Sequence, residues 1–259
     1  SGFRNAALMM PAALPEYTSL FPDVQRFAHS TPYTSHPLSP FKRMAFAGAS
    51  NAWAAAPSRS ASGGTLLAND PHLGFTAPAI WYLARLELQS GGVIGATIPG
   101  VPTVLAGRSA DLGWGLTSSF MDDQDVYIEE LNPANREEYR TPDGFKKFRT
   151  RASIITVKDM DPVTLTLRWT DNGPVLPGSH YNLADITPPG TVAAVNWTVL
   201  SQRDTTMQAA MELMHAKTVA DGIEAAALFV APSQNLTLVD KQNIVMKTIG
   251  AAPKRDPLH

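Results

Sequence analysis

The chain has 259 residues, of which 44% are hydrophobic and 17% charged, and its formal net charge is −2. These values are typical of a folded protein with a buried core and exclude a largely disordered chain. A nearly neutral charge argues against nucleic acid or an anionic membrane as a partner, and the absence of cysteine excludes disulfides and thiol catalysis. No apolar run approaches the ~20 residues of a membrane span.

Residues 1–49 differ in composition from the rest of the chain. Six prolines fall within them, and Ser, Thr and His are scattered between these prolines. Proline lacks the amide proton and restricts the residue before it, which disfavours long helices and central strands. This stretch is therefore predicted to be an extended linker arm.

From Ser50 onward, short apolar and β-branched runs alternate with glycine and proline. Gly63-Gly64 and Ser90-Gly91-Gly92 are turn signals of the kind that join antiparallel strands. Several short strands at close spacing predict one antiparallel sheet up to Leu131. The strands are expected at residues 50–56, 65–68, 80–89, 93–98, 103–106, 112–117 and 125–131.

The remaining chain mixes strands with two helices. Asn132-Pro133-Ala134 predicts a short helical turn, and helix-spaced apolar residues predict helices at 205–215 and 219–230. Thr218 and Asp221 are suited to cap the second helix. Further strands are expected at residues 147–157, 163–170, 192–200, 235–239 and 243–248.

Ser50 lies in the run Gly48-Ala49-Ser50-Asn51-Ala52-Trp53. A serine hydroxyl needs a base to become nucleophilic, and the chain has no G-x-S-x-G motif. Cleavage of the bond before Ser50 would supply such a base, because an α-amino group has a reference pKa of about 7.7–8.0. Taken alone, Gly-Ala-Ser is more typical of an ordinary small-residue bend than of a nucleophile.

The order Ser-Asn-x-Trp, followed by Asn69-Asp70-Pro71-His72-Leu73, resembles the start of the catalytic chain in the penicillin amidase (penicillin acylase) family of N-terminal-nucleophile hydrolases. The resemblance implies an α+β fold with two stacked antiparallel sheets between helices (αββα), incomplete in this chain. It also implies autoproteolysis between Ala49 and Ser50. Residues 50–259 would then form the first part of the catalytic β chain, with a β-rich insertion around 140–200.

The same resemblance implies a set of catalytic residues. Ser50 would be the nucleophile, and His72 would orient it or bind its amine. The run from Gly107 to Phe120 contains Trp-Gly-x-Thr, after which the backbone N–H of Ser118 would face the substrate oxyanion. Ala231-Pro232-Ser233-Gln234-Asn235-Leu236 would supply the second oxyanion donor from the Asn235 amide. Ser118 fits an ordinary polar loop about as well.

Substrate and metal contacts are also implied. Leu73, Phe75 and Phe120 are apolar residues that would line an acyl pocket, and Arg255 matches an arginine near the substrate or nucleophile. Asp122, Gln124 and Asp125 offer oxygen ligands for a structural calcium ion. Their spacing is not that of an EF-hand loop. In the alternative interpretation, the acidic residues are structural and bind no metal. No cofactor is expected to be required.

The resulting hypothesis is an amidohydrolase that cleaves a linear amide through an acyl-enzyme. A penicillin-type side chain, a fatty-acyl homoserine lactone and a lipopeptide all remain open as substrates. The alternative is a non-catalytic binding or assembly module that keeps the fold. The resemblance implies as partners an α subunit and the remainder of the β chain, and a periplasmic or secreted location. The 259-residue chain alone is expected to be inactive.

Overall fold

Residues 50–73, 77–179 and 183–255 are described by the computed structural model of the chain. They divide into two compact units. The first contains residues 50–73, 77–123 and 201–255, and the second contains residues 124–179 and 183–200. The predicted arm over residues 1–49 lies outside the described residues.

The first unit is built on a six-stranded antiparallel sheet whose strand order is β15-β14-β6-β5-β4-β3. The two sequence segments of the unit meet where β14 pairs with β6. The strands are β3 (Tyr82–Leu88), β4 (Gly91–Thr97), β5 (Ala106–Arg108), β6 (Gly113–Ser118), β14 (Gln234–Val239) and β15 (Ile244–Ile249).

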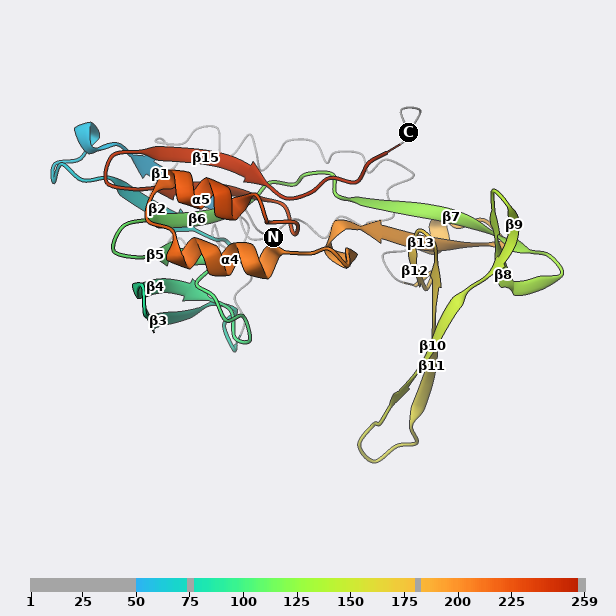
Figure 1. The fold of residues 1–259 in the computed structure, drawn as a ribbon. Coiled ribbons are helices and arrows are strands. Elements are labelled where there is room, and N and C mark those ends of the chain that lie inside the picture. The colour runs from blue at the N-terminus through green and yellow to red at the C-terminus, as the bar shows by residue number, and fades with distance from the viewer. Residues whose placement is uncertain (1–49, 74–76, 180–182, 256–259) are drawn as a thin grey trace, which may run out of the picture. The chain divides into compact units, whose positions relative to one another are not determined.

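Two helices, α4 (Thr206–His215) and α5 (Val219–Ala226), pack against one face of this sheet (Figure 1). Trp114 and Leu238 are fully buried there, and the Trp114 indole donates to the Val104 carbonyl at 3.0 Å. Gly222 lets α5 approach closely, because a Cβ at that position would lie 2.8 Å from a Leu238 methyl group. The helix layer therefore depends on a small residue facing a large one.

The predicted cap of α5 is present. The Thr218 hydroxyl accepts from the Asp221 N–H, and the Asp221 carboxylate accepts from the Thr218 N–H, which is a capping box. Backbone N–H donors at Lys217 and Thr218 hold the pKa of Asp221 below its usual value. Asp240, in the β14–β15 turn, also accepts from the Val219 N–H at the helix start.

The opposite face of the sheet is covered by a two-stranded antiparallel hairpin of β1 (Asn51–Ala55) and β2 (Leu66–Asp70), with a short 3-10 turn (Pro57–Arg59) in its loop. Side chains alternate along β6, so Gly113 and Gly115 face away from the helices that cover Trp114. A Cβ at Gly113 would meet Leu67, and one at Gly115 would meet Asn69. The hairpin therefore lies directly on β6.

The prediction of one continuous sheet from Ser50 to Leu131 is wrong. The first two strands form their own sheet on top of the six-stranded one, and β7 (Gln124–Asn132) belongs to the second unit. Strand propensity identifies strands but carries no information about which sheet they join. The layers of the first unit are helices, six-stranded sheet and hairpin.

The second unit is a seven-stranded antiparallel sheet whose order is β10-β11-β12-β13-β7-β8-β9. The predicted insertion around 140–200 falls within this unit, and its status as an insertion stays a prediction. Besides β7, the strands are β8 (Asn135–Thr141), β9 (Gly144–Lys147), β10 (Arg149–Ile155), β11 (Val163–Thr170), β12 (Gly173–Leu176) and β13 (Thr191–Trp197), with 3-10 turns at Leu183–Asp185 and Thr198–Leu200.

The helical turn predicted at Asn132 is wrong. The Asn132 side chain accepts from the Ala134 N–H at 3.0 Å and makes a tight turn between β7 and β8. The strand predicted at 147–157 is divided, since β9 ends at Lys147 and β10 begins at Arg149. Strands β8 and β9 were missed because their largely exposed polar sequences lack a clear alternation.

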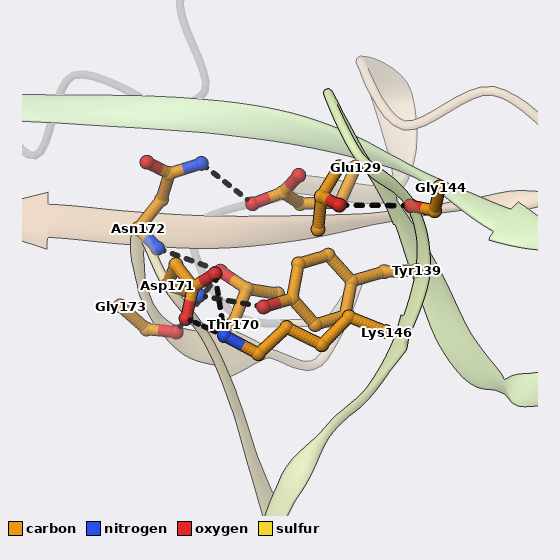
Figure 2. A network of polar contacts seen from close by, with 9 residues as sticks. Glu129, Tyr139, Gly144, Lys146, Thr170, Asp171, Asn172 and Gly173 are labelled. Atoms are coloured by element: carbon orange, nitrogen blue, oxygen red, sulfur yellow. Dashed lines mark hydrogen bonds and ion pairs between the residues drawn. The ribbon is translucent and has the colours of Figure 1, made fainter.

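A polar network holds the turn between β11 and β12 against β7, β8 and β9 (Figure 2). The Asp171 carboxylate lies 2.7 Å from the Lys146 ammonium, which lowers the Asp171 pKa, and the Asp171 N–H donates to the Tyr139 hydroxyl. Asn172 donates to the buried Glu129 carboxylate at 2.9 Å. Glu129 therefore has a structural partner within its own sheet.

Candidate active site

Ser50 is half-buried and directly precedes β1. In the β1–β2 register Asn51 pairs with Asp70, so the hairpin brings Pro71 and His72 to the end of the hairpin where Ser50 lies. His72 Nε2 lies 2.6 Å from Asp70 Oδ2, and both side chains are exposed. The two sequence stretches that drew attention to Ser50 therefore meet at one end of a hairpin.

Asn69 connects this end of the hairpin to β6. Its side-chain amide donates to the Asn51 carbonyl at 2.8 Å and to the Leu116 carbonyl at 3.1 Å. Its side-chain oxygen accepts from the Leu116 N–H at 3.1 Å. Because Leu67 lies over Gly113 and Asn69 over Gly115, the Ser50 end of the hairpin lies toward the Ser118 end of β6.

The backbone of Ser118 presents its N–H on the same edge of β6. Ser118 is opposite Gln234 on β14, and the adjoining Ser119 N–H lies 3.5 Å from the Ser233 carbonyl. In antiparallel sheets, this pattern marks a pair that exchanges no backbone hydrogen bond. The Ser118 N–H therefore points away from β14, toward the edge on which Leu116 meets Asn69.

Asn235 lies on β14 between two threonines of the neighbouring strands. Thr248 on β15 donates to Asn235 Oδ1 at 2.9 Å, and Asn235 Nδ2 lies 3.4 Å from the Thr117 hydroxyl oxygen on β6. In this arrangement the amide oxygen lies on the β15 side and the amide nitrogen on the β6 side. Asn235 thus directs an N–H donor toward the β6 side, one residue from Ser118.

The segment after Ser118 is bent and tied at its end. Phe120 has a φ of 53°, in the left-handed region, and its side chain is 65% exposed. Arg255 Nη2 lies 3.1 Å from both the backbone carbonyl and the carboxylate of Asp122. Arg255, predicted near substrate or nucleophile, therefore fastens the segment that follows the candidate oxyanion donor.

The three residues predicted to line an acyl pocket do not line a common cavity in the described part of the chain. Leu73 and Phe120 are both exposed, and Phe75 lies outside the described residues. A hollow of about 650 Å³ in this unit lies between the hairpin and β4–β6, but its lining includes neither Leu73 nor Phe120. Its lining includes Gly113 and Trp114 of β6, and also Asn69 and Pro71 of the hairpin.

The predicted calcium ligands, Asp122, Gln124 and Asp125, lie at the junction of the two units in the sequence. Among the described residues, no cluster of three or more His, Cys, Asp or Glu side chains is placed to hold a metal. The Asp122 carboxylate is ion-paired with Arg255, whose guanidinium takes the position of a cation. The calcium site therefore stays a prediction, and no step of the chemistry is assigned to a calcium ion.

Three residues of this site were not assigned a role from the sequence: Asn69, Thr117 and Thr248. Asn69 was within the noted Asn-Asp-Pro-His-Leu stretch, but its partner Leu116 is 47 positions away. The available signal was Gly115 inside a strand, since an interior glycine often marks a close approach. A Cβ at Gly115 would lie 3.0–3.1 Å from atoms of the Asn69 side chain.

The fold matches that of a thermostable penicillin G acylase from Alcaligenes faecalis, with a TM-score of 0.72 and 24% identity over 82% of this chain and 37% of that chain. This confirms the predicted α+β, N-terminal-nucleophile hydrolase fold. The sequence model of the penicillin amidase family matches residues 4–259, and the chain belongs to that family.

Several curated relatives are similar to this chain. It is 31% identical over 212 residues to an acyl-homoserine lactone acylase, QuiP, of Pseudomonas aeruginosa, covering 80% of this chain and 25% of the relative. It is 32% identical over 141 residues to penicillin acylase 2 proenzyme of Pseudomonas sp. strain SE83, covering 54% and 18%. The chain thus spans about a quarter or less of these relatives.

Within the described part of the chain, no helix is long and apolar enough to cross a membrane.

Proposed function

We propose that the protein containing this chain is an acylase that hydrolyses a linear amide with Ser50 as an N-terminal nucleophile. The observation that carries the proposal is that the Ser50 end of the hairpin lies toward the Ser118 end of β6, beside which β14 carries Asn235. The β1–β2 register, the Asn69 contacts and the β6–β14 register together produce it. The alternative, a non-catalytic binding or assembly module, predicts neither a free Ser50 amine nor acylation of Ser50.

Maturation begins at Ser50. Its Oγ attacks the Ala49 carbonyl, the Ala49–Ser50 C–N bond breaks, and the acyl group moves to the serine oxygen while the nitrogen takes up a proton. Water then hydrolyses this ester, which leaves a carboxylate on Ala49 and a free amine on Ser50. That amine has a reference pKa near neutral pH and is suited to act as a base.

Substrate hydrolysis then uses the same hydroxyl. The Ser50 amine accepts the Oγ proton as Oγ attacks the amide carbonyl, and the negative charge that develops on the carbonyl oxygen is met by Ser118 N–H and Asn235 Nδ2–H. The leaving amine takes the proton from the Ser50 amine, and an ester remains on Ser50. Water hydrolyses this ester and releases the carboxylic acid.

The names of the relatives favour two substrate classes, acyl-homoserine lactones and penicillins. Both contain a linear amide between an acyl group and an amine, which is the bond in the proposed reaction. The proposal includes the earlier expectations of an α subunit, the remainder of the β chain and a periplasmic or secreted location. An acyl-chain profile of the full-length enzyme, measured by release of the free amine, distinguishes the substrates.

The central test is Ser50→Ala in the full-length protein. We expect loss of cleavage before residue 50, seen by intact mass spectrometry, and loss of amide hydrolysis. Ser60→Ala is the matched control, because Ser60 lies in the loop of the same hairpin and its hydroxyl bonds to the exposed hydroxyl of Ser62. Wild-type cleavage and turnover in Ser50→Ala would overturn the nucleophile assignment.

A further inference from the structure

We infer that Asn69 is a positioning residue that holds β1 in place against β6. Strand β1 begins directly after the proposed nucleophile Ser50, and β6 ends at the proposed oxyanion donor Ser118. The inference rests on the proposed function of Ser50 and Ser118. It concerns a residue that touches neither substrate nor the reacting atoms, and that acts through Asn51 and Leu116.

The bonding of Asn69 replaces a missing strand partner. The backbone N–H and C=O of Leu116 point away from β14, but β5 pairs with β6 only at Gly113 and Trp114. The Asn69 side chain accepts from that N–H and donates to that C=O, much as a neighbouring strand would. Leu116 is thereby satisfied by a side chain from the layer above.

A second bond of the same amide extends to β1. Asn69 Nδ2 also donates to the Asn51 carbonyl at 2.8 Å. Asn51 follows Ser50 directly, and Leu116 is two residues before Ser118 on the same edge of β6. One carboxamide thus links the backbone next to the nucleophile with the backbone next to the oxyanion donor.

The chemistry of the site requires a carboxamide. Two carbonyl oxygens need donors and one N–H needs an acceptor, which is the capacity of an asparagine side chain. An aspartate has the same shape but would direct a carboxylate at two carbonyls. Gly115 completes the arrangement, because any Cβ there would lie 3.0–3.1 Å from Asn69 Cβ, Cγ and Oδ1.

The functional consequence follows from the geometry of nucleophilic attack. A displacement of ~1 Å between the reacting groups can lower the rate by about 10². Removing the Asn69 link frees the Ser50 end of β1 to shift relative to Ser118 while leaving both groups chemically intact. The effect should therefore fall on the rate of the chemical step rather than on substrate binding.

The test compares Asn69→Asp and Asn69→Ala with Thr65→Val in the full-length protein. Thr65 is the matched control, because its hydroxyl ties the same hairpin to the Asp240 carbonyl at 2.7 Å, but at the end remote from Ser50. The measurements are Tm, the rate of cleavage before Ser50, and kcat and KM for an acyl amide that the wild-type enzyme hydrolyses.

We expect both Asn69 variants to lose roughly 10- to 100-fold in kcat with little change in KM, and to be cleaved more slowly. Thr65→Val should keep the wild-type kcat even if its Tm falls by as much as the Tm of the Asn69 variants. Should the Asn69 variants fail to fold, Gly115→Ala perturbs the same contact from the other side and is expected to lower kcat in the same way.

Equal kcat losses in the Asn69 variants and in Thr65→Val at matched Tm would overturn the inference. The Asn69 contacts would then stabilise the packing of the hairpin on the sheet without positioning Ser50. Wild-type kcat in Asn69→Asp would also overturn the inference. The two proposals fail separately: an active Ser50→Ala protein would reject the nucleophile, whereas an inactive Ser50→Ala protein with a fully active Asn69→Asp variant would reject Asn69 alone.

Discussion

At the scale of single residues, the orientation of the Asn235 amide distinguishes it from an ordinary polar side chain in a sheet. Its oxygen accepts from the Thr248 hydroxyl, and its nitrogen lies on the β6 side, 3.4 Å from the Thr117 hydroxyl oxygen. An amide donor does not titrate, and it is in place before charge develops on the substrate. The Asn235 amide is therefore suited to stabilise the oxyanion without taking part in activating Ser50.

We therefore predict that Asn235→Ala in the full-length protein lowers kcat by roughly 10²–10³, the usual effect of losing one oxyanion donor. Cleavage before Ser50 should remain largely intact. Steady-state kinetics and intact mass spectrometry measure the two effects.

Thr248→Val provides a graded control for that prediction. It keeps Asn235 but removes the donor that orients its oxygen. Its kcat should lie between those of the wild type and Asn235→Ala. Unchanged turnover in Asn235→Ala would remove the residue from the site.

At the scale of elements, Asp240 joins the start of α5 to the β14–β15 turn. Its carboxylate accepts backbone N–H bonds from Val219, Gln242 and Asn243, at 3.0, 2.9 and 2.7 Å. Burial alone would raise the pKa of Asp240, but these bonds and the Asn243 side chain outweigh it and lower the pKa to about 2. The helix layer and the β14–β15 hairpin that carries Asn235 therefore share one anchor.

Because its pKa is lower in the folded state, Asp240 contributes stability that is fully present above about pH 4 and is lost as the pH falls toward about 2. We predict that Asp240→Asn lowers the free energy of unfolding by roughly 1–2 kcal/mol at neutral pH. The difference from wild type should shrink between pH 4 and pH 2, as measured by denaturant unfolding across pH.

Asp111→Asn is the matched control for Asp240→Asn. Asp111 pairs with the neighbouring Lys241 at 3.6 Å through largely exposed side chains, a contact of little value for stability. It should leave the free energy of unfolding nearly unchanged. A pH-independent effect of Asp240→Asn would show that the carboxylate charge does not contribute.

At the scale of the whole molecule, the first unit carries apolar side chains on its outer surfaces. Trp53 is 56% exposed on the hairpin, and Leu83 is 80% exposed on β3. Leu66 and Tyr82 add to these exposed groups. Apolar groups of this size on a surface favour association with other protein surfaces.

We predict that the 259-residue chain, produced alone, stays uncleaved between Ala49 and Ser50, does not hydrolyse acyl amides, and self-associates. An uncut Ser50 lacks the free amine that is proposed as its base, and the exposed apolar groups lack cover. Intact mass spectrometry, an amide hydrolysis assay and light scattering test the three statements. A species that starts at Ser50 and hydrolyses an acyl amide would contradict the prediction.

Local patterns in the sequence were enough to predict the family, the fold class, the α5 capping box and most strands. Ser-Asn-x-Trp with Asn-Asp-Pro-His-Leu indicated the family, and Thr218 with Asp221 indicated the start of a helix. These features depend on neighbours within a few residues or on a motif read in order, so a linear sequence contains them. The strands from Asn135 to Lys147 were missed because their exposed side chains have no regular alternation.

Only the tertiary structure decided how the site residues meet. A strand sequence does not state its register, and the direction of the Ser118 N–H depends on whether its pair with Gln234 exchanges hydrogen bonds. The sequence likewise does not state that Asn69 reaches Leu116, or that the first hairpin forms a sheet of its own over Gly113 and Gly115. Such contacts join residues far apart in the chain, and their free energy depends on packing and register that no local stretch encodes.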